Sequence, residues 1–202
     1  MALKSKPHYG FEDYLTAERA QAEVKHEYVD GEVFAMTGAS FNHNLIVLNL
    51  GSELRAQLKD RPCHVLPSDM RVRIEAANAS KYPDLVALCE TPRFHDGRND
   101  VLLNPTLLIE VLSRSTEAYD RGGKFAIYRR LPSLKEYALV SQDRPMVEIY
   151  TRQGYGRWLL GEAEGLDGEA TFESLMCRIR MLEIYAKVDF ELGEQGSGLV
   201  EY

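Results

Sequence analysis

The chain has 202 residues, of which 45% are hydrophobic and 27% charged, with 15 glycines and 8 prolines. This usage is typical of a globular domain and excludes a mostly disordered chain, a collagen-like fibre and a disulfide-rich miniprotein. No apolar run approaches the roughly 20 residues that a membrane-spanning helix needs. The basic residues near the N-terminus are not followed by an apolar stretch, so the sequence predicts no secretory signal and a cytoplasmic location.

The net charge of −7 is unevenly distributed. Residues 161–202 hold ten acidic and three basic residues, which account for the whole net charge. In the neutral remainder, residues 120–135 hold one acidic residue, Asp120, and five basic residues. The basic residues are Arg121, Lys124, Arg129, Arg130 and Lys135. Such a run is either a solvated face or a local basic surface for nucleic-acid phosphates. The candidate nucleic-acid-binding residues are Arg121, Arg129, Arg130 and Lys135.

The three cysteines, Cys63, Cys89 and Cys177, show no motif. No pair forms Cys-x-x-Cys, which argues against zinc binding and against thioredoxin-like chemistry. We expect all three to be small, unpaired and buried side chains in a reducing compartment.

The first elements predicted are a helix, a hairpin and a second helix, at residues 11–22, 26–36 and 40–59. Asp30-Gly31 lies between the two β-rich runs of the hairpin, and glycine takes the positive φ that a tight primed turn needs. Ser40 is predicted to cap the second helix, which Pro62 follows.

Short strands dominate the rest of the chain, at residues 70–74, 82–89, 107–112, 134–140, 147–150 and 157–160. The last two are predicted to form an antiparallel meander. The first alternates apolar and basic residues and should be half exposed. A polar loop is expected over residues 91–104, a helix over 120–130, and a short helix or strand near 181–188.

No internal repeat or interdomain linker interrupts this pattern. The sequence therefore predicts one α+β domain over residues 1–192, with a central mixed sheet, and a frayed tail over residues 193–202.

Glu110 interrupts a run of apolar residues in the predicted strand 107–112. Alternation places it on the same face as Leu108 and Leu112. An unpaired carboxylate would be costly to bury there, so it needs a basic partner or a cation. A structural salt bridge is the alternative to a functional role.

Asp84 follows Pro83, which forces an extended backbone at the start of another buried strand. Two carboxylates on adjacent central strands would form an oxygen-rich pocket suited to Mg²⁺. The alternative is that Asp84 caps a strand or a turn.

Several stretches together resemble a known family: residues 82–86, 108–113 and 115–116, then Asp120, Lys124 and Tyr128, then residues 131–137. The resemblance extends upstream to Glu27, Ser40 and His43, and downstream to residues 172–175. In this order and spacing the sequence resembles the Uma-two family, which is assigned to restriction endonucleases of the PD-(D/E)XK nuclease superfamily.

The resemblance implies a restriction-endonuclease-like core, in which helices flank a mixed sheet. It also implies that Asp84 and Glu110 bind Mg²⁺ or Mn²⁺. Glu27 would be a further acid, either a second ligand or a holder of water, unless it is only a solvated hairpin residue.

One departure concerns the lysine that the wider superfamily has two positions after the glutamate. Here that position is Leu112, which cannot hold a water or a phosphate. Lys124, on the following helix, is the candidate substitute; the alternative is a surface lysine near a helix start. His43 is better explained as a helix-cap or supporting group than as a general base.

The leading hypothesis is a metal-dependent endonuclease that hydrolyses DNA, acts as a homodimer and uses Glu27, Asp84, Glu110 and Lys124. A catalytically silent nucleic-acid-binding or assembly module is the alternative, favoured by Leu112 and the acidic tail. A third hypothesis is an oligomerisation domain with an aromatic patch of Tyr150, Tyr155 and Trp158.

Overall fold

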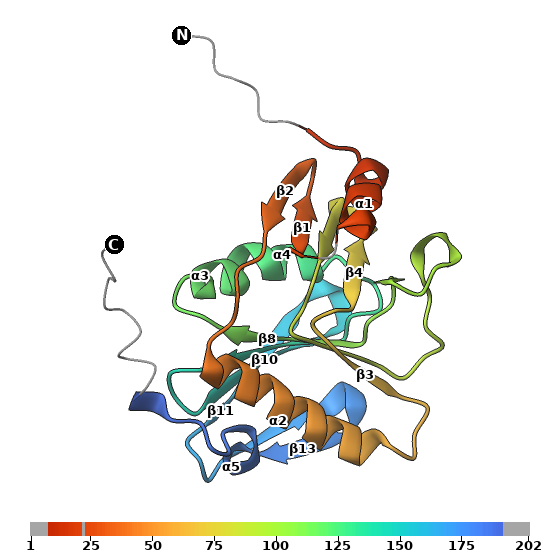
Figure 1. The fold of residues 1–202 in the computed structure, drawn as a ribbon. Helices are drawn as coiled ribbons and strands as arrows, with labels where there is room; N and C mark the ends of the chain where they lie inside the picture. Colours follow the sequence, from red (N-terminus) through yellow and green to blue (C-terminus); the bar gives the residue numbers. More distant parts are fainter. Residues whose placement is uncertain (1–7, 22, 192–202) are drawn as a thin grey trace, which may run out of the picture.

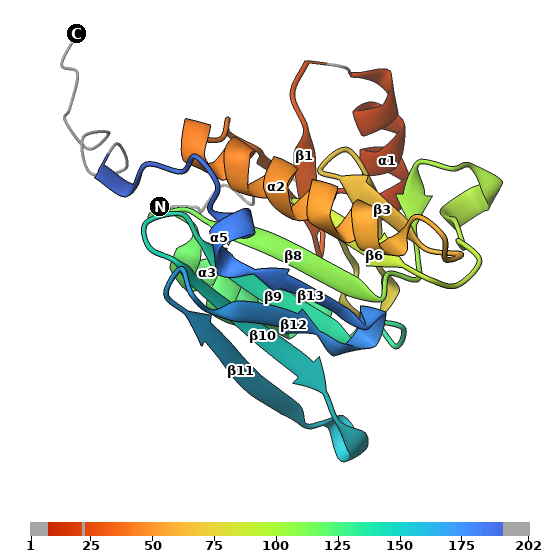
Figure 2. The ribbon, with the colours of Figure 1, turned by 90° about the horizontal axis from the view of Figure 1, so that it is seen from below.

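The computed structural model describes residues 8–21 and 23–191, so the predicted tail lies outside the described residues. The centre of the fold is a mixed six-stranded sheet (Figures 1 and 2). Its strands, in spatial order, are β11 (Trp158–Glu164), β10 (Met146–Arg152), β9 (Glu136–Ser141), β8 (Leu107–Leu112), β6 (Leu85–Leu88) and β3 (His64–Pro67). Only β8 and β9 run parallel; the other neighbours in this sheet are antiparallel.

Two smaller sheets complete the strand content of the described residues. One has the order β2 (Glu32–Ala35), β1 (His26–Val29), β5 (Ala79–Lys81), β4 (Arg71–Ile74) and β7 (Val101–Leu102). The other is the hairpin of β12 (Glu169–Phe172) and β13 (Cys177–Arg180). The predicted α+β architecture with a mixed sheet and a C-terminal meander is confirmed.

The α-helices are α1 (Phe11–Ala20), α2 (Phe41–Leu58), α3 (Glu117–Tyr119), α4 (Phe125–Tyr128) and α5 (Met181–Ile184). A π-helical turn, Asp120–Lys124, joins α3 to α4. Short 3-10 turns lie at Glu75–Ala77, His95–Gly97, Gly154–Gly156 and Glu173–Leu175. Among the described residues, no helix combines the length and apolar character needed to cross a membrane.

β8 is buried on both faces and separates two layers of the core. Leu107, Ile109 and Val111 pack into a cluster with α2, α5 and the β12–β13 hairpin. Leu108 and Leu112 pack into a second cluster with α4 and β4. The predicted alternation is confirmed, and it puts Glu110 on the side of the second cluster.

The prediction that residues 70–74 are half exposed is wrong, because β4 is buried throughout. Its arginines have partners inside the fold. The Arg71 guanidinium donates to the Tyr82 hydroxyl over 2.8 Å. Arg73 lies over the Phe11 ring, 3.7 Å from its centroid, and donates to the Ala79 carbonyl. Paired arginines can therefore mimic the alternating pattern of a solvated strand.

The prediction of three unpaired cysteines is wrong for two of them. Cys63 and Cys89 form a disulfide. The pairing of β3 with β6 sets His64 opposite Leu88, so the residues just outside these two positions meet. Cys177 is unpaired and buried, as expected.

The sequence pattern missed β3, β5, β7, β12 and β13, which have two to four residues each. It also placed the start of the helix over residues 120–130 too late, because helical structure begins at Glu117. The three residues of the proposed aromatic patch do not form one surface. Tyr150 and Trp158 pack against Phe125, with ring centroids 4.5 and 5.3 Å from that of Phe125. Tyr155, in contrast, is fully exposed.

Candidate functional site

A cavity of about 710 Å³ opens where the end of β8, the start of α2 and the β1–β2 hairpin converge. The helical segment from Thr116 to Lys124 forms another wall. The four predicted catalytic residues all line this cavity: Glu27, Asp84, Glu110 and Lys124. Residues that are far apart in the sequence thus share one site.

Asp84 and Glu110 lie side by side because β6 and β8 are antiparallel neighbours. Leu85 pairs with Ile109, so the residue just before Leu85 lies beside the residue just after Ile109. The Asp84 Oδ2 atom accepts the Val111 N–H over 2.8 Å. This bond fixes one carboxylate against the strand that carries the other.

Glu110 is almost fully buried and has a protein partner at each carboxylate oxygen. The Tyr128 hydroxyl donates to Oε1 over 2.8 Å, and Lys124 Nζ lies 3.1 Å from Oε2. Burial raises the pKa of Glu110 to about 8, against an opposing effect of Lys124. The carboxylates of Asp84 and Glu27 contribute to the same rise.

Lys124, the last residue of the π-helical turn, reaches Glu110. Its Nζ also lies 2.9 Å from Asp120 Oδ1. Burial alone would lower the pKa of Lys124, but Glu110, Glu27 and Asp120 raise it above its usual range. The amine therefore stays charged among these carboxylates. π-Helical turns inside helices occur frequently at functional sites.

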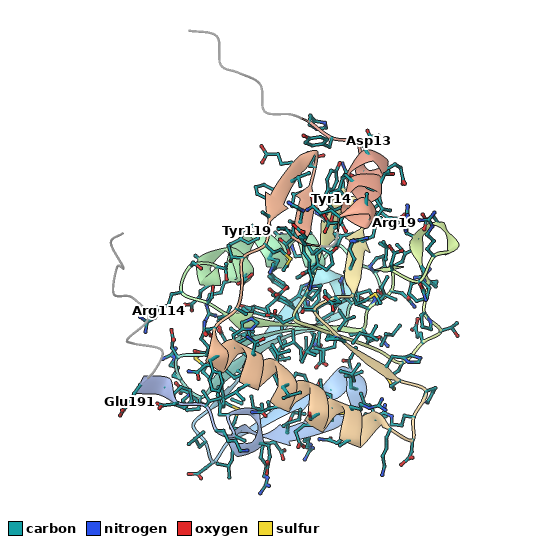
Figure 3. The ribbon with its side chains drawn as sticks, in the orientation of Figure 1. Asp13, Tyr14, Arg19, Arg114, Tyr119 and Glu191 are labelled. Carbon is teal, nitrogen blue, oxygen red and sulfur yellow. A yellow bond between two sulfur atoms is a disulfide. The ribbon has the colours of Figure 1, made fainter. Side chains whose placement is uncertain are left out.

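Glu27, which also lines the cavity, is held by a second lysine, Lys81. Lys81 Nζ donates to Glu27 Oε2 over 2.6 Å and to the Tyr119 hydroxyl over 3.0 Å. The same amine lies 5.1 Å from the centre of the Tyr119 ring, whose place on α3 is marked in Figure 3. Glu27 is thus a paired residue of the site rather than a solvated hairpin acid.

His43 connects the helix start with Asp84. The Ser40 hydroxyl accepts the His43 N–H over 3.1 Å and caps α2, as predicted. The His43 Nε2 atom lies 3.1 Å from Asp84 Oδ2. The imidazole therefore supports a carboxylate that already accepts a backbone bond.

The donors of the site are those of a hard divalent cation. Mg²⁺ binds through one or two carboxylates and retains several waters. Asp84 and Glu110 offer such oxygens to one cavity, so their chemistry fits this ion. Within residues 8–21 and 23–191, no three or more His, Cys, Asp or Glu side chains are grouped closely enough to hold a metal by themselves. Water would therefore have to complete the coordination.

The four candidate nucleic-acid-binding residues are not part of the cavity lining. Arg121 pairs with Glu117 and with Glu148. Arg129 and Lys135 are exposed, as is Arg130, which donates to the Ala76 carbonyl. The structure thus separates this basic surface from the site.

Two charged residues of the site were not selected from the sequence. Lys81 directly precedes the stretch that carries Asp84, and it is almost fully buried. Asp120 stands four residues before Lys124, a spacing that brings helical side chains together. The sequence offered a signal for each. Lys81 directly precedes a predicted buried strand, and Asp120 is an acid four residues before the proposed amine of Lys124.

Comparisons with known proteins show the family of the chain. The model of the Uma2 family, described as "Putative restriction endonuclease", matches residues 11–179. Two uncharacterized proteins of Synechocystis sp. (strain ATCC 27184 / PCC 6803 / Kazusa) are each 39% identical to the chain. One, sll1609, aligns over 79% of this chain and 90% of its own length; the other, slr1290, aligns over 74% and 77%.

A crystal structure described as a putative nuclease belonging to DUF820, from Anabaena variabilis ATCC 29413, has a similar fold. The TM-score is 0.70 at 16% sequence identity, and the alignment covers 86% of this chain and 96% of that one. The family match spans most of the described residues, from α1 to β13. The chain therefore belongs to the Uma2 family.

Proposed function

We propose that this protein is a metal-dependent endonuclease that hydrolyses phosphodiester bonds in DNA. The observation that carries the proposal is the contact between Lys124 and Glu110 inside a cavity that Asp84 and Glu27 also line. The family and the fold support a nuclease role. The metal dependence and the DNA substrate rest on the chemistry of the site.

In this proposal Asp84 and Glu110 hold a Mg²⁺ or Mn²⁺ ion. Such an ion, when bound, activates water and stabilises charge on the scissile phosphate. The Val111 N–H and His43 keep the Asp84 carboxylate in place. Glu27, held by Lys81, orients a water in the same cavity.

Lys124 is assigned to the phosphate. Its ammonium lies in a largely buried position between two carboxylates, where a charge acts more strongly than in bulk water. Ion binding by Glu110 would free Lys124 to contact a phosphate oxygen. The helical turn thus supplies the positive charge that Leu112 does not.

A catalytically silent nucleic-acid-binding module is the second candidate. One observation favours it: both oxygens of Glu110 already have protein donors. Burial also raises the pKa of Glu110 to about 8, which opposes ionisation and hence metal binding at neutral pH.

A cleavage assay separates the two candidates. Supercoiled, linear and single-stranded DNA are incubated with Mg²⁺ or Mn²⁺, with Asp84→Asn as the matched control because it keeps the side-chain shape. We expect cleavage by the wild type, none in EDTA and little by Asp84→Asn. Equal cleavage by both proteins would identify a contaminant, and DNA binding without cleavage would support the silent module.

A further inference from the structure

β11 lies at the end of the six-stranded sheet, so one of its edges is unpaired among the described residues (Figure 2). It is seven residues long, five of them exposed, and it pairs with β10 without a bulge. It contains no lysine or proline, which commonly protect edge strands. This edge is open to another strand.

The backbone bonds of the β10–β11 hairpin determine which groups face outward. At one end, the Gln153 N–H donates to the Arg157 carbonyl; at the other, the Gly165 N–H donates to the Pro145 carbonyl. Hydrogen-bonded pairs alternate along an antiparallel ladder, so the odd-numbered residues of β11 bond to β10. The N–H and C=O groups that face the open edge belong to Trp158, Leu160, Glu162 and Glu164.

The side chains at the middle of β11 are apolar on both faces. Leu159 is 62% exposed and Leu160 is 44% exposed. Gly161 follows them and allows another backbone to approach closely. Leu159, Leu160 and Gly161 thus form an uncharged stretch of the open edge, and the exposed Glu162 and Glu164 lie beyond it.

We propose that β11 pairs with β11 of a second copy of this chain, antiparallel and centred on Gly161. In that register all seven residues of the strand are paired. Leu159 lies opposite Ala163 of the second copy, and Leu160 lies opposite Glu162 of the second copy. The two six-stranded sheets then form one continuous sheet.

Charge favours the register centred on Gly161 over the register centred on Glu162. A pairing centred on Glu162 would set two carboxylates directly opposite each other, which destabilises a sheet. In the register centred on Gly161, each glutamate of β11 lies opposite an apolar residue. Charge therefore disfavours the register centred on Glu162, and the pairing of all seven residues of β11 favours the register centred on Gly161.

The first test measures molar mass by light scattering over a range of protein concentrations. We expect a mass twice that of the monomer for the wild type. Leu160→Pro removes an N–H that faces the open edge and should produce a monomer while β10 pairing persists. Leu159→Lys/Leu160→Lys should do the same by charge repulsion, whereas the exposed control Leu48→Lys should remain dimeric.

The second test traps the register. A Cβ added at Gly161 would meet only the Ile149 carbonyl, at 4.0 Å, so Gly161→Cys fits the fold. Under mild oxidation it should form a covalent dimer, because the two positions are directly opposite in a non-hydrogen-bonded pair. The control Leu160→Cys should form none. A monomeric wild type, or a dimer that all β11 variants retain, would overturn the proposal; cross-linking at 160 instead of 161 would overturn the register.

Discussion

Lys124 Nζ lies 3.1 Å from Glu110 Oε2, although the two residues belong to different elements. The strand supplies the acid, and the helical segment after it supplies the amine. Tyr128, one turn further along the helical segment, donates to the other oxygen of the same carboxylate. Glu110 is therefore held by two side chains of one helical segment, so changes in that segment should affect the strand residue directly.

Metal affinity is the first property that this arrangement predicts. Mn²⁺ titrations by calorimetry should detect binding that Glu110→Gln weakens strongly and that Asp84→Asn/Glu110→Gln abolishes. Circular dichroism should show an unchanged fold, because both substitutions keep side-chain shape. Undiminished Mn²⁺ binding by the double variant would place the ion elsewhere.

Glu110 should also make stability depend on pH. Its pKa is raised from 4.5 to about 8, first by burial and then by Asp84 and other acids. Between these values the folded state holds a proton that the unfolded state has lost, so the free energy of unfolding falls as pH rises through this window. Glu110→Gln cannot ionise and lacks this contribution. In EDTA, thermal unfolding from pH 5 to 8.5 should show the variant gaining stability relative to the wild type; parallel curves would contradict the assignment.

The parts of the fold that were predicted correctly are those with a strong local signal. The run of residues 107–112 is apolar on both faces and indicated a central strand, and Ser40 marked the start of α2. The isolated charge at Glu110 marked it as a candidate site residue because burial makes such a charge costly, whereas Glu27 and Lys124 became candidates through the family resemblance. These signals depend only on neighbouring residues.

The remaining features depend on contacts between distant segments. Arg71 is buried because Tyr82 and Asp100 accept its hydrogen bonds, which no local periodicity records. Cys63 and Cys89 meet through the β3–β6 register. Lys81 enters the site because β5 pairs with β1, the strand that carries Glu27. Pairing of such short strands is set by tertiary structure, and the sequence pattern alone could not predict it.

Two adjacent glycines in the π-helical turn provide a matched pair of variants. A Cβ added at Gly123 would lie 2.6 Å from the Tyr119 ring, whereas one added at Gly122 would meet nothing within 4 Å. Gly123→Ala should displace Tyr119 from Lys81 and destabilise the fold by about 1–3 kcal/mol. Gly122→Ala should be neutral or stabilising by up to ~1 kcal/mol. Denaturant unfolding measures both, and equal effects would show that the Tyr119 contact is unimportant.

DNA affinity should depend steeply on salt if Arg129, Arg130 and Lys135 contact phosphates, because each contact releases counterions. Arg129→Ala/Arg130→Ala should weaken binding and reduce the salt slope by about one to two. Fluorescence anisotropy with labelled DNA at several salt concentrations measures this. Cleavage at saturating DNA should persist, since these side chains lie outside the cavity. Absence of any binding at low salt would exclude both the nuclease and the silent nucleic-acid-binding module.

The sharpest prediction concerns the choice between two lysines. Lys124 lines the cavity and contacts Glu110, whereas Lys81 is more deeply buried and contacts Glu27. Lys124→Ala should lower the cleavage rate by about a hundredfold or more, as when one stabiliser of transition-state charge is removed. Mn²⁺ affinity should be unchanged or slightly higher, because a positive neighbour of the ion is lost. The exposed control Lys59→Ala, which lies outside both the cavity and the candidate DNA-binding residues, should retain the rate. Wild-type cleavage by Lys124→Ala together with a folded but inactive Lys81→Ala would assign the catalytic amine to Lys81.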